Sequence, residues 1–176
     1  MTWAEAFDWN YWVSTINGGA HFALALAALA LGPVLFFRGK GSRFHRLAGY
    51  AFVLSMLTVN ITALTQYDFS GGPNIFHFFA LMSLSALLPG FYVLQRAVRL
   101  KSEALLATHA RLMMWAYFGL AAAGLSQIGT RVLPQITGDF GTTLSIIGGS
   151  IGVASLLGFL TFGRASKALA KRYPFD

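Results

Sequence analysis

Five long runs of apolar residues limit what this chain can fold into. They cover about residues 11–37, 47–65, 74–94, 105–128 and 142–162. An α-helix needs about 20 apolar residues to cross the hydrocarbon core of a bilayer, and each run meets that length. The sequence therefore predicts an all-α membrane protein with five transmembrane helices in a single domain, residues 1–176. We expect the first four helices to form a bundle and the fifth to pack outside it.

The composition also favours a lipid environment. Only 11% of the residues are charged, whereas a soluble domain of this size carries about 25%. The net charge of +7 does not indicate nucleic-acid binding, because the basic residues form short clusters between the apolar runs, as in the cytoplasmic loops of membrane proteins. The chain has no cysteine, which excludes disulfides and thiolate metal sites.

The distribution of basic residues predicts an orientation. Of the 13 Lys and Arg residues, all except Arg131 fall at one end of the predicted helices. The opposite end carries the acidic residues Glu5, Asp8, Asp68 and Asp139. Since Lys and Arg favour the cytoplasmic side, we expect the N-terminus outside and the C-terminus in the cytoplasm, in a bacterial inner membrane.

All four histidines of the chain fall near the ends of predicted helices. His21 and His77 lie near the outer ends of the first and third helices, and His45 and His109 near the inner ends of the second and fourth. About 24 Å of helix, at 1.5 Å per residue, separates His21 from the inner end of its helix. The sequence thus predicts two separate pairs, His21 with His77 and His45 with His109.

Paired imidazoles in a bundle core can ligate one haem iron between them. We therefore expect two bis-His b-type haems and transmembrane electron transfer, with a quinol, a flavoprotein or a small reductant as the partner. Amide side chains at helix positions that face the two pairs are Asn60, Gln95 and Gln127. Candidates for binding the haem propionates are Arg46, Arg111 and Arg131.

Other interpretations of these residues stay open. Imidazole also suits zinc and copper, so a second interpretation is a metal transport or metal-binding protein. In a third interpretation, the chain is a structural subunit of a larger membrane complex and the histidines form hydrogen bonds between helices. The arginines then determine topology or contact lipid phosphates, and the amides form hydrogen bonds between helices.

An internal repeat is one interpretation of the histidine spacing. Aligning His21 with His77 also aligns Pro33 with Pro89, which suggests that a two-helix unit is duplicated. Such a repeat has its axis along the membrane normal and puts the first helix diagonally across from the third. Matches between apolar sequences also arise by chance.

Two resemblances follow from these residues. Over about residues 17–132, the chain resembles a family of bacterial integral membrane proteins catalogued as a domain of unknown function. The motif that carries this resemblance is His21…Gly32-Pro33…His45-Arg46-x-x-Gly49-Tyr50…His77…His109…Met113. One histidine on each of four consecutive helices is also similar to the di-haem transmembrane b-type cytochromes reduced by ascorbate. That resemblance implies one haem held by His21 and His77 and another by His45 and His109. The predicted five spans differ from the six of that family.

Overall fold

The computed structural model describes residues 13, 15–66 and 71–172, and the side chains of Arg131 and Gln135 are outside that description. The described residues form α-helices and no strands. The helices are α3 (Ile16–Phe37), α4 (Arg43–Leu64), α5 (Ile75–Arg99), α6 (Glu103–Thr137) and α7 (Phe140–Ala170). In this part of the chain, five helices are long and apolar enough to cross a membrane. The predicted fold class is therefore confirmed.

Several helices continue beyond the predicted membrane spans. α4 begins at Arg43 rather than near residue 47, and α6 continues to Thr137 rather than ending near residue 128. Ends are set by capping side chains: Ser42 accepts a hydrogen bond from a backbone N–H of α4, and Ser102 does so for α6. The apolar runs predict which residues lie in the hydrocarbon layer, whereas the capping serines determine where each of these helices begins.

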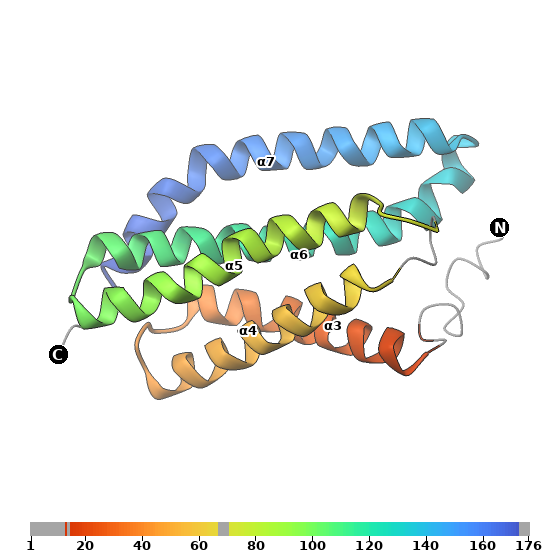
Figure 1. Cartoon of the computed structure of the whole chain (residues 1–176). Coiled ribbons are helices and arrows are strands. Elements are labelled where there is room, and N and C mark those ends of the chain that lie inside the picture. The colour runs from red at the N-terminus through yellow and green to blue at the C-terminus, as the bar shows by residue number, and fades with distance from the viewer. Residues whose placement is uncertain (1–12, 14, 67–70, 173–176) are drawn as a thin grey trace.

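The first four described helices form a ring (Figure 1). α3 packs against α4, α4 against α5, and α5 against α6, while a smaller contact between α6 and α3 closes the ring. α7 packs along α6 on the outside, as expected. This order puts α3 diagonally across from α5 and α4 across from α6, which is the arrangement that the repeat interpretation requires.

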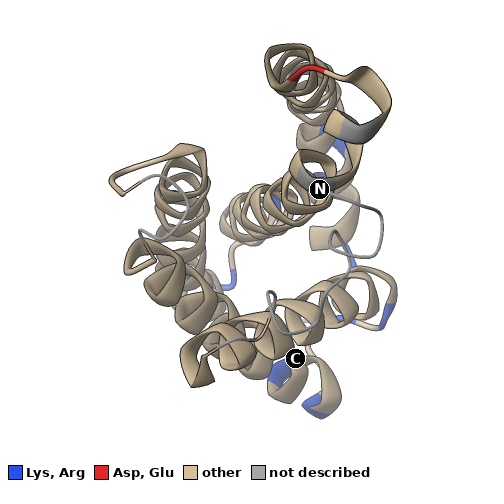
Figure 2. Ribbon diagram, turned by 90° about the vertical axis from the view of Figure 1, so that its right-hand side faces the viewer, with Lys and Arg blue, Asp and Glu red and all other residues tan. Residues whose placement is uncertain are grey.

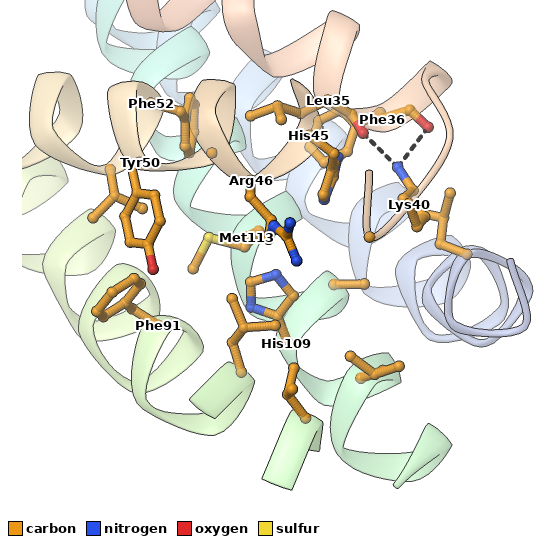
Figure 3. A pocket seen from close by; sticks show the side chains of 18 of the residues that line it. Leu35, Phe36, Lys40, His45, Arg46, Tyr50, Phe52, Phe91, His109 and Met113 are labelled. Atoms are coloured by element: carbon orange, nitrogen blue, oxygen red, sulfur yellow. Dashed lines mark hydrogen bonds between the residues drawn. The ribbon is translucent and has the colours of Figure 1, made fainter. Parts of the chain in front are cut away.

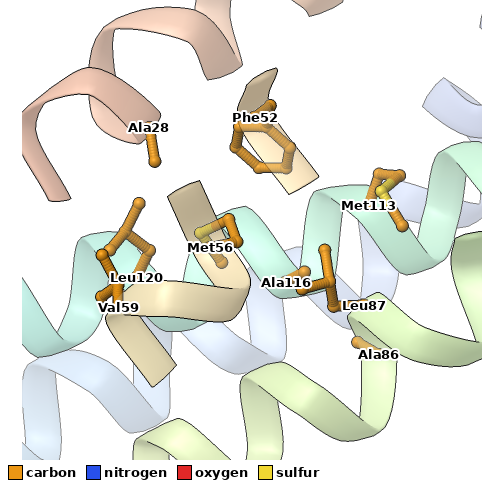
Figure 4. Close-up of a cluster of buried hydrophobic side chains, with 9 residues drawn as sticks. All are labelled: Ala28, Phe52, Met56, Val59, Ala86, Leu87, Met113, Ala116 and Leu120. Carbon is orange, nitrogen blue, oxygen red and sulfur yellow. The ribbon is translucent and has the colours of Figure 1, made fainter. Parts of the chain in front are cut away.

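Tight packing of apolar side chains holds the ring together (Figure 4). Because lipid is as apolar as a protein core, helices in a bilayer associate through close packing rather than through the hydrophobic effect. Small side chains from three helices let the backbones approach. The buried cluster comprises Ala28, Phe52, Met56, Val59, Ala86, Leu87, Met113, Ala116 and Leu120.

A hydrogen bond between α3 and α6 compensates for a proline in α3. Pro33 has no N–H, so the carbonyl of Leu29 lacks its usual helical donor. An unpaired carbonyl in lipid costs several kcal/mol. The hydroxyl of Tyr117 donates to that oxygen at 3.1 Å. Gly32 makes room for the tyrosine, because a Cβ there would lie 2.2 Å from a ring carbon of Tyr117.

One end of the bundle carries most of the basic residues; we call it the basic end. It comprises the 38–42 turn, the 100–102 turn and the last turn of α7, which all lie at the left of Figure 1. Figure 2 looks along the helices from the opposite end and shows blue segments on several of them. Asp139, the N-cap of α7, belongs to that opposite end.

Candidate cofactor site at the basic end

A cavity of about 390 Å³ lies among the helices at the basic end (Figure 3). Its volume is within the range of about 300–1,000 Å³ that is usual for small-molecule and cofactor sites. All five helices contribute to its walls, which are mostly apolar. Its charged, imidazole and amide side chains are those of Lys40, His45, Arg46, Gln95 and His109. We call it the basic-end cavity.

His45 and His109 both line the basic-end cavity. His45 belongs to the first turn of α4 and His109 to the second turn of α6. These two residues are 64 positions apart in the chain, and the sequence pairs them only because both lie at the inner depth of the membrane. In the structure they share one cavity.

The imidazole of His109 is oriented by α5. Its Nδ1 lies 2.8 Å from the carbonyl oxygen of Gly90. A carbonyl only accepts, so Nδ1 carries the proton and Nε2 of the neutral ring keeps its lone pair. Gly90 allows this approach, since a Cβ there would lie 2.4 Å from Met113 Cε and 3.0 Å from Leu112 Cβ. Histidines that ligate metals commonly donate their second ring N–H in this way.

His45 has an unsatisfied ring nitrogen. Its backbone N–H donates to Ser42 Oγ at 3.1 Å, which fixes the start of α4. Its Nδ1 is buried and has no hydrogen-bond partner among the described residues. A buried polar atom left in that state costs about 1–3 kcal/mol, and a bound ligand is one of the few explanations that structures provide for such an atom.

Two cations stand at the same cavity. Lys40 donates to the carbonyl oxygens of Leu35 and Phe36 (Figure 3), which satisfies the last turn of α3. Burial, together with the nearby charge of Arg172, lowers the pKa of Lys40 to about 8. Arg46 lines the cavity as well.

The other two predicted arginines differ from Arg46. Arg46 and Arg111 are both exposed, but Arg111 is not among the residues that line the basic-end cavity. The side chain of Arg131 is outside the described part of the chain. A propionate-binding role for either residue therefore stays a prediction.

The three predicted amides have different surroundings. Gln95 lines the basic-end cavity, at the inner depth that its helical position predicts. Asn60 is buried and donates to Met56 O at 2.7 Å and to Ser83 Oγ at 3.1 Å, so it joins α4 to α5. Gln127 is half-buried on α6. Of these three, Asn60 thus has the interhelical hydrogen bond that was the alternative interpretation.

His21 hydrogen-bonds to α4. Its Nδ1 lies 2.8 Å from Thr62 Oγ1. The Thr62 hydroxyl already donates to backbone carbonyls, 2.7 Å from Thr58 O and 3.0 Å from Val59 O. Its oxygen therefore accepts from His21, whose Nδ1 carries the proton. His21 joins α3 to α4 in this way.

In His77, unlike His21, Nδ1 accepts a hydrogen bond. Its Nδ1 accepts from the backbone N–H of Asn74 at 3.3 Å, and the Asn74 side chain in return accepts from the first turn of α5. This reciprocal pair is a capping box. Because Nδ1 is the acceptor, the neutral ring carries its proton on Nε2. His21 and His77 therefore have separate partners and opposite tautomers.

Sequence reasoning missed the groups that orient the histidines. Gly90 acts through a backbone carbonyl, which leaves no signal in the sequence. Lys40 follows the first predicted helix, and a lysine in that position commonly binds the last carbonyls of the helix. The Asn74-x-x-His77 spacing was the one available signal for a capping box.

Comparison with known proteins gives a family. Residues 19–163 match the family described as "Predicted membrane protein (DUF2306)", a domain of unknown function. The chain belongs to this family. No curated protein and no solved structure matches the chain. The DUF2306 match includes all four histidines, and it agrees with the first of the two resemblances; the comparisons add no support for the cytochrome resemblance.

Proposed function

We propose that this DUF2306 protein is a membrane haem protein that transfers electrons, with a b-type haem held by His45 and His109 in the basic-end cavity. The observation that carries the proposal is that both imidazoles line one cavity. The tautomer of His109 leaves Nε2 as the basic nitrogen. The buried Nδ1 of His45 has no hydrogen-bond partner among the described residues, and a ligand would supply one. A bound haem supplies one-electron chemistry.

The chain's own groups have distinct tasks in this proposal. The Gly90 carbonyl holds the His109 ring in one orientation. Apolar residues such as Phe52 and Phe91 would pack against the porphyrin. The guanidinium of Arg46 is suited to a propionate, because its planar donors match a carboxylate.

A second haem at His21 and His77 has less support. Binding through Nδ1 of His77 would break its capping box with Asn74. Binding through Nε2 would require loss of the proton that the capping box assigns to that atom. The second site stays a prediction.

We take the basic end to be the cytoplasmic one, because Lys and Arg are retained on that side. The electron donor, whether a flavoprotein, a quinol or a small reductant, then approaches from the cytoplasm or the inner leaflet. A reporter fused after the last residue should be active only in the cytoplasm. Activity of that fusion only outside the cell would reverse this assignment.

Absorption spectra test the haem proposal. The purified protein should show a Soret band and, after dithionite reduction, a b-type α-band. His45→Ala and His109→Ala should each abolish the same spectral component, because a lone imidazole does not hold the bis-His state. His21→Ala is the control for this component and should leave it unchanged, since His21 bonds to Thr62 and does not line the basic-end cavity.

Two other outcomes separate the alternatives. A colourless protein that retains zinc or copper, and loses it in His45→Ala, would replace the haem proposal by the metal-transport one. The described residues hold no group of three or more His, Cys, Asp or Glu side chains able to bind a metal ion. A colourless and metal-free protein from haem-replete cells would refute both proposals and favour a structural subunit.

A further inference from the structure

We infer that the basic-end cavity recognises an acid group on an apolar ligand, and that Lys40 and Arg46 are the residues that bind this group. The inference rests on the proposed function because it assigns the ligand to the same cavity, but it does not require iron or ligation by the histidines. It also assigns Lys40, rather than Arg111, as the second anion-binding residue.

Within the described residues, no carboxylate pairs with the cations of the basic-end cavity. The acidic residues in the described part of the chain are Glu103 and Asp139. Asp139 is at the opposite end of the bundle, and Glu103 is at the basic end but is exposed and does not line the cavity. No ion pair joins Lys40 or Arg46 to a carboxylate within that part of the chain. Lys40 is half-buried, and a cation at such a position is costly unless an anion compensates it, whereas Arg46 is exposed. An acidic ligand would provide that compensation.

Lys40 is held in place for such a contact. An ammonium group has three N–H donors, and two are directed to the carbonyls of Leu35 and Phe36. This anchors Nζ at the end of α3 and leaves one donor. Lys40 lines the same cavity as the imidazoles of His45 and His109. A ligand that lies between the imidazoles would therefore have its edge near Lys40.

Arg46 supplies the second contact. It lines the cavity on the α4 side, and no hydrogen bond engages its guanidinium within the described residues. In Figure 3 its side chain extends into the space between α4 and α6. A guanidinium forms two parallel hydrogen bonds to a carboxylate or a phosphate, so Arg46 complements the single donor of Lys40.

The remaining walls fit an apolar body. Phe52, Val53, Phe91 and Leu106 line the cavity. Tyr50, which packs edge-to-face on Phe91 with ring centroids 6.1 Å apart, is 58% exposed on the α4–α5 side. A ligand dissolved in the bilayer can therefore approach from this side with its acid group towards the basic end. The shared chemistry fits a porphyrin carboxylate or the phosphate of an anionic lipid.

The test uses iron-free protoporphyrin IX and its dimethyl ester, with the full chain in phosphatidylcholine nanodiscs. The two probes share one apolar body, and only the first has free acid groups. We expect the ester to bind about tenfold more weakly, as measured by fluorescence, which corresponds to about 1.4 kcal/mol. This comparison uses the unchanged protein, so it does not depend on how a variant folds.

Variants then assign the contact. Lys40→Met should weaken binding of the free acid several-fold and leave binding of the ester unchanged, whereas Lys40→Arg should retain the preference for the acid. Lys167→Met, which removes an exposed cation from the last turn of α7 at the same end, is the matched control. Equal binding of acid and ester, or equal effects of Lys40→Met and Lys167→Met, would overturn the inference.

A second measurement separates this inference from the haem proposal. If neither porphyrin binds, the haem proposal fails and the lipid is the remaining source of the acid group. The chain purified from phosphatidylglycerol membranes should then retain this lipid in native mass spectra, and the double variant Lys40→Met/Arg46→Met should lose it. Equal retention by both proteins, or retention by neither, would overturn the inference.

Discussion

The contact between Tyr117 and the Leu29 carbonyl gives the sharpest test of how this fold is held together. Tyr117→Phe removes the only atom that donates to this oxygen in the described contacts and leaves the ring in place. Hydrogen bonds between membrane helices are worth about 0.6 kcal/mol on average and at most about 1.7. Since Pro33 has already removed the helical donor, we expect a cost near the upper half of that range, about 1 kcal/mol.

The proline makes the prediction specific. Pro33→Ala restores an N–H four residues after Leu29, so the carbonyl regains a donor within the helix. In that background Tyr117→Phe should cost less, with a coupling free energy of about 0.5 kcal/mol or more. The coupling is smaller than a whole hydrogen bond, because a carbonyl oxygen has two lone pairs and can accept from both donors.

The assay is equilibrium unfolding of four proteins: the wild type, the two single variants and the double variant. Steric trapping in bicelles measures the free energy without leaving a bilayer-like solvent. Tyr92→Phe is the control, since Tyr92 is 60% exposed on α5. If Tyr117→Phe costs the same with and without Pro33, the tyrosine does not compensate for the proline and the reasoning is refuted.

Three further predictions concern packing, polar contacts and pH. Gly32→Ala should destabilise the fold by about 1–3 kcal/mol, because the new Cβ would lie 2.2 Å from the ring of Tyr117; Gly49→Ala, with nothing within 4 Å of its Cβ, should not. Asn60→Ala should cost about 1 kcal/mol in unfolding free energy through loss of the α4–α5 hydrogen bond, and an unchanged stability would contradict that contact. The pKa of Lys40 is lowered to about 8, mainly by burial, so its charge is present below that pH and lost above it. Protoporphyrin should therefore bind more weakly as the pH rises from 7 to 9 in the wild type but not in Lys40→Arg, and a flat profile in both would contradict the role of Lys40.

The fold was predictable because lipid imposes one simple requirement. Every backbone polar group in the hydrocarbon layer must be satisfied within the protein, so long apolar runs become helices. Helix ends were harder to predict, since Ser42 and Ser102 set them through single hydrogen bonds. The peripheral position of α7 was predicted, but its contribution of Leu169 and Ala170 to the cavity wall was not.

The candidate site was predictable in its depth and not in its detail. Helix rise and alternating direction place His45 and His109 at one end, and the 18-residue spacing from His77 brings Gln95 to the same depth. The orientation of each ring depends on which backbone or side-chain group the neighbouring helix presents. That depends on helix rotation and crossing angle, which apolar sequence determines only weakly.

The four histidines differ in what their second nitrogen can do, and this argues for the basic end as the functional one. His21 and His109 both carry the proton on Nδ1, but the partner of His109 is a main-chain carbonyl beside a cavity, whereas His21 bonds to a threonine that joins two helices. His77 is committed to the start of its helix. His45 lines the basic-end cavity, and its buried Nδ1 has no hydrogen-bond partner among the described residues. A ligand that binds His45 through Nδ1 therefore satisfies an existing deficit, whereas ligation through Nδ1 of His77 would break its hydrogen bond with Asn74.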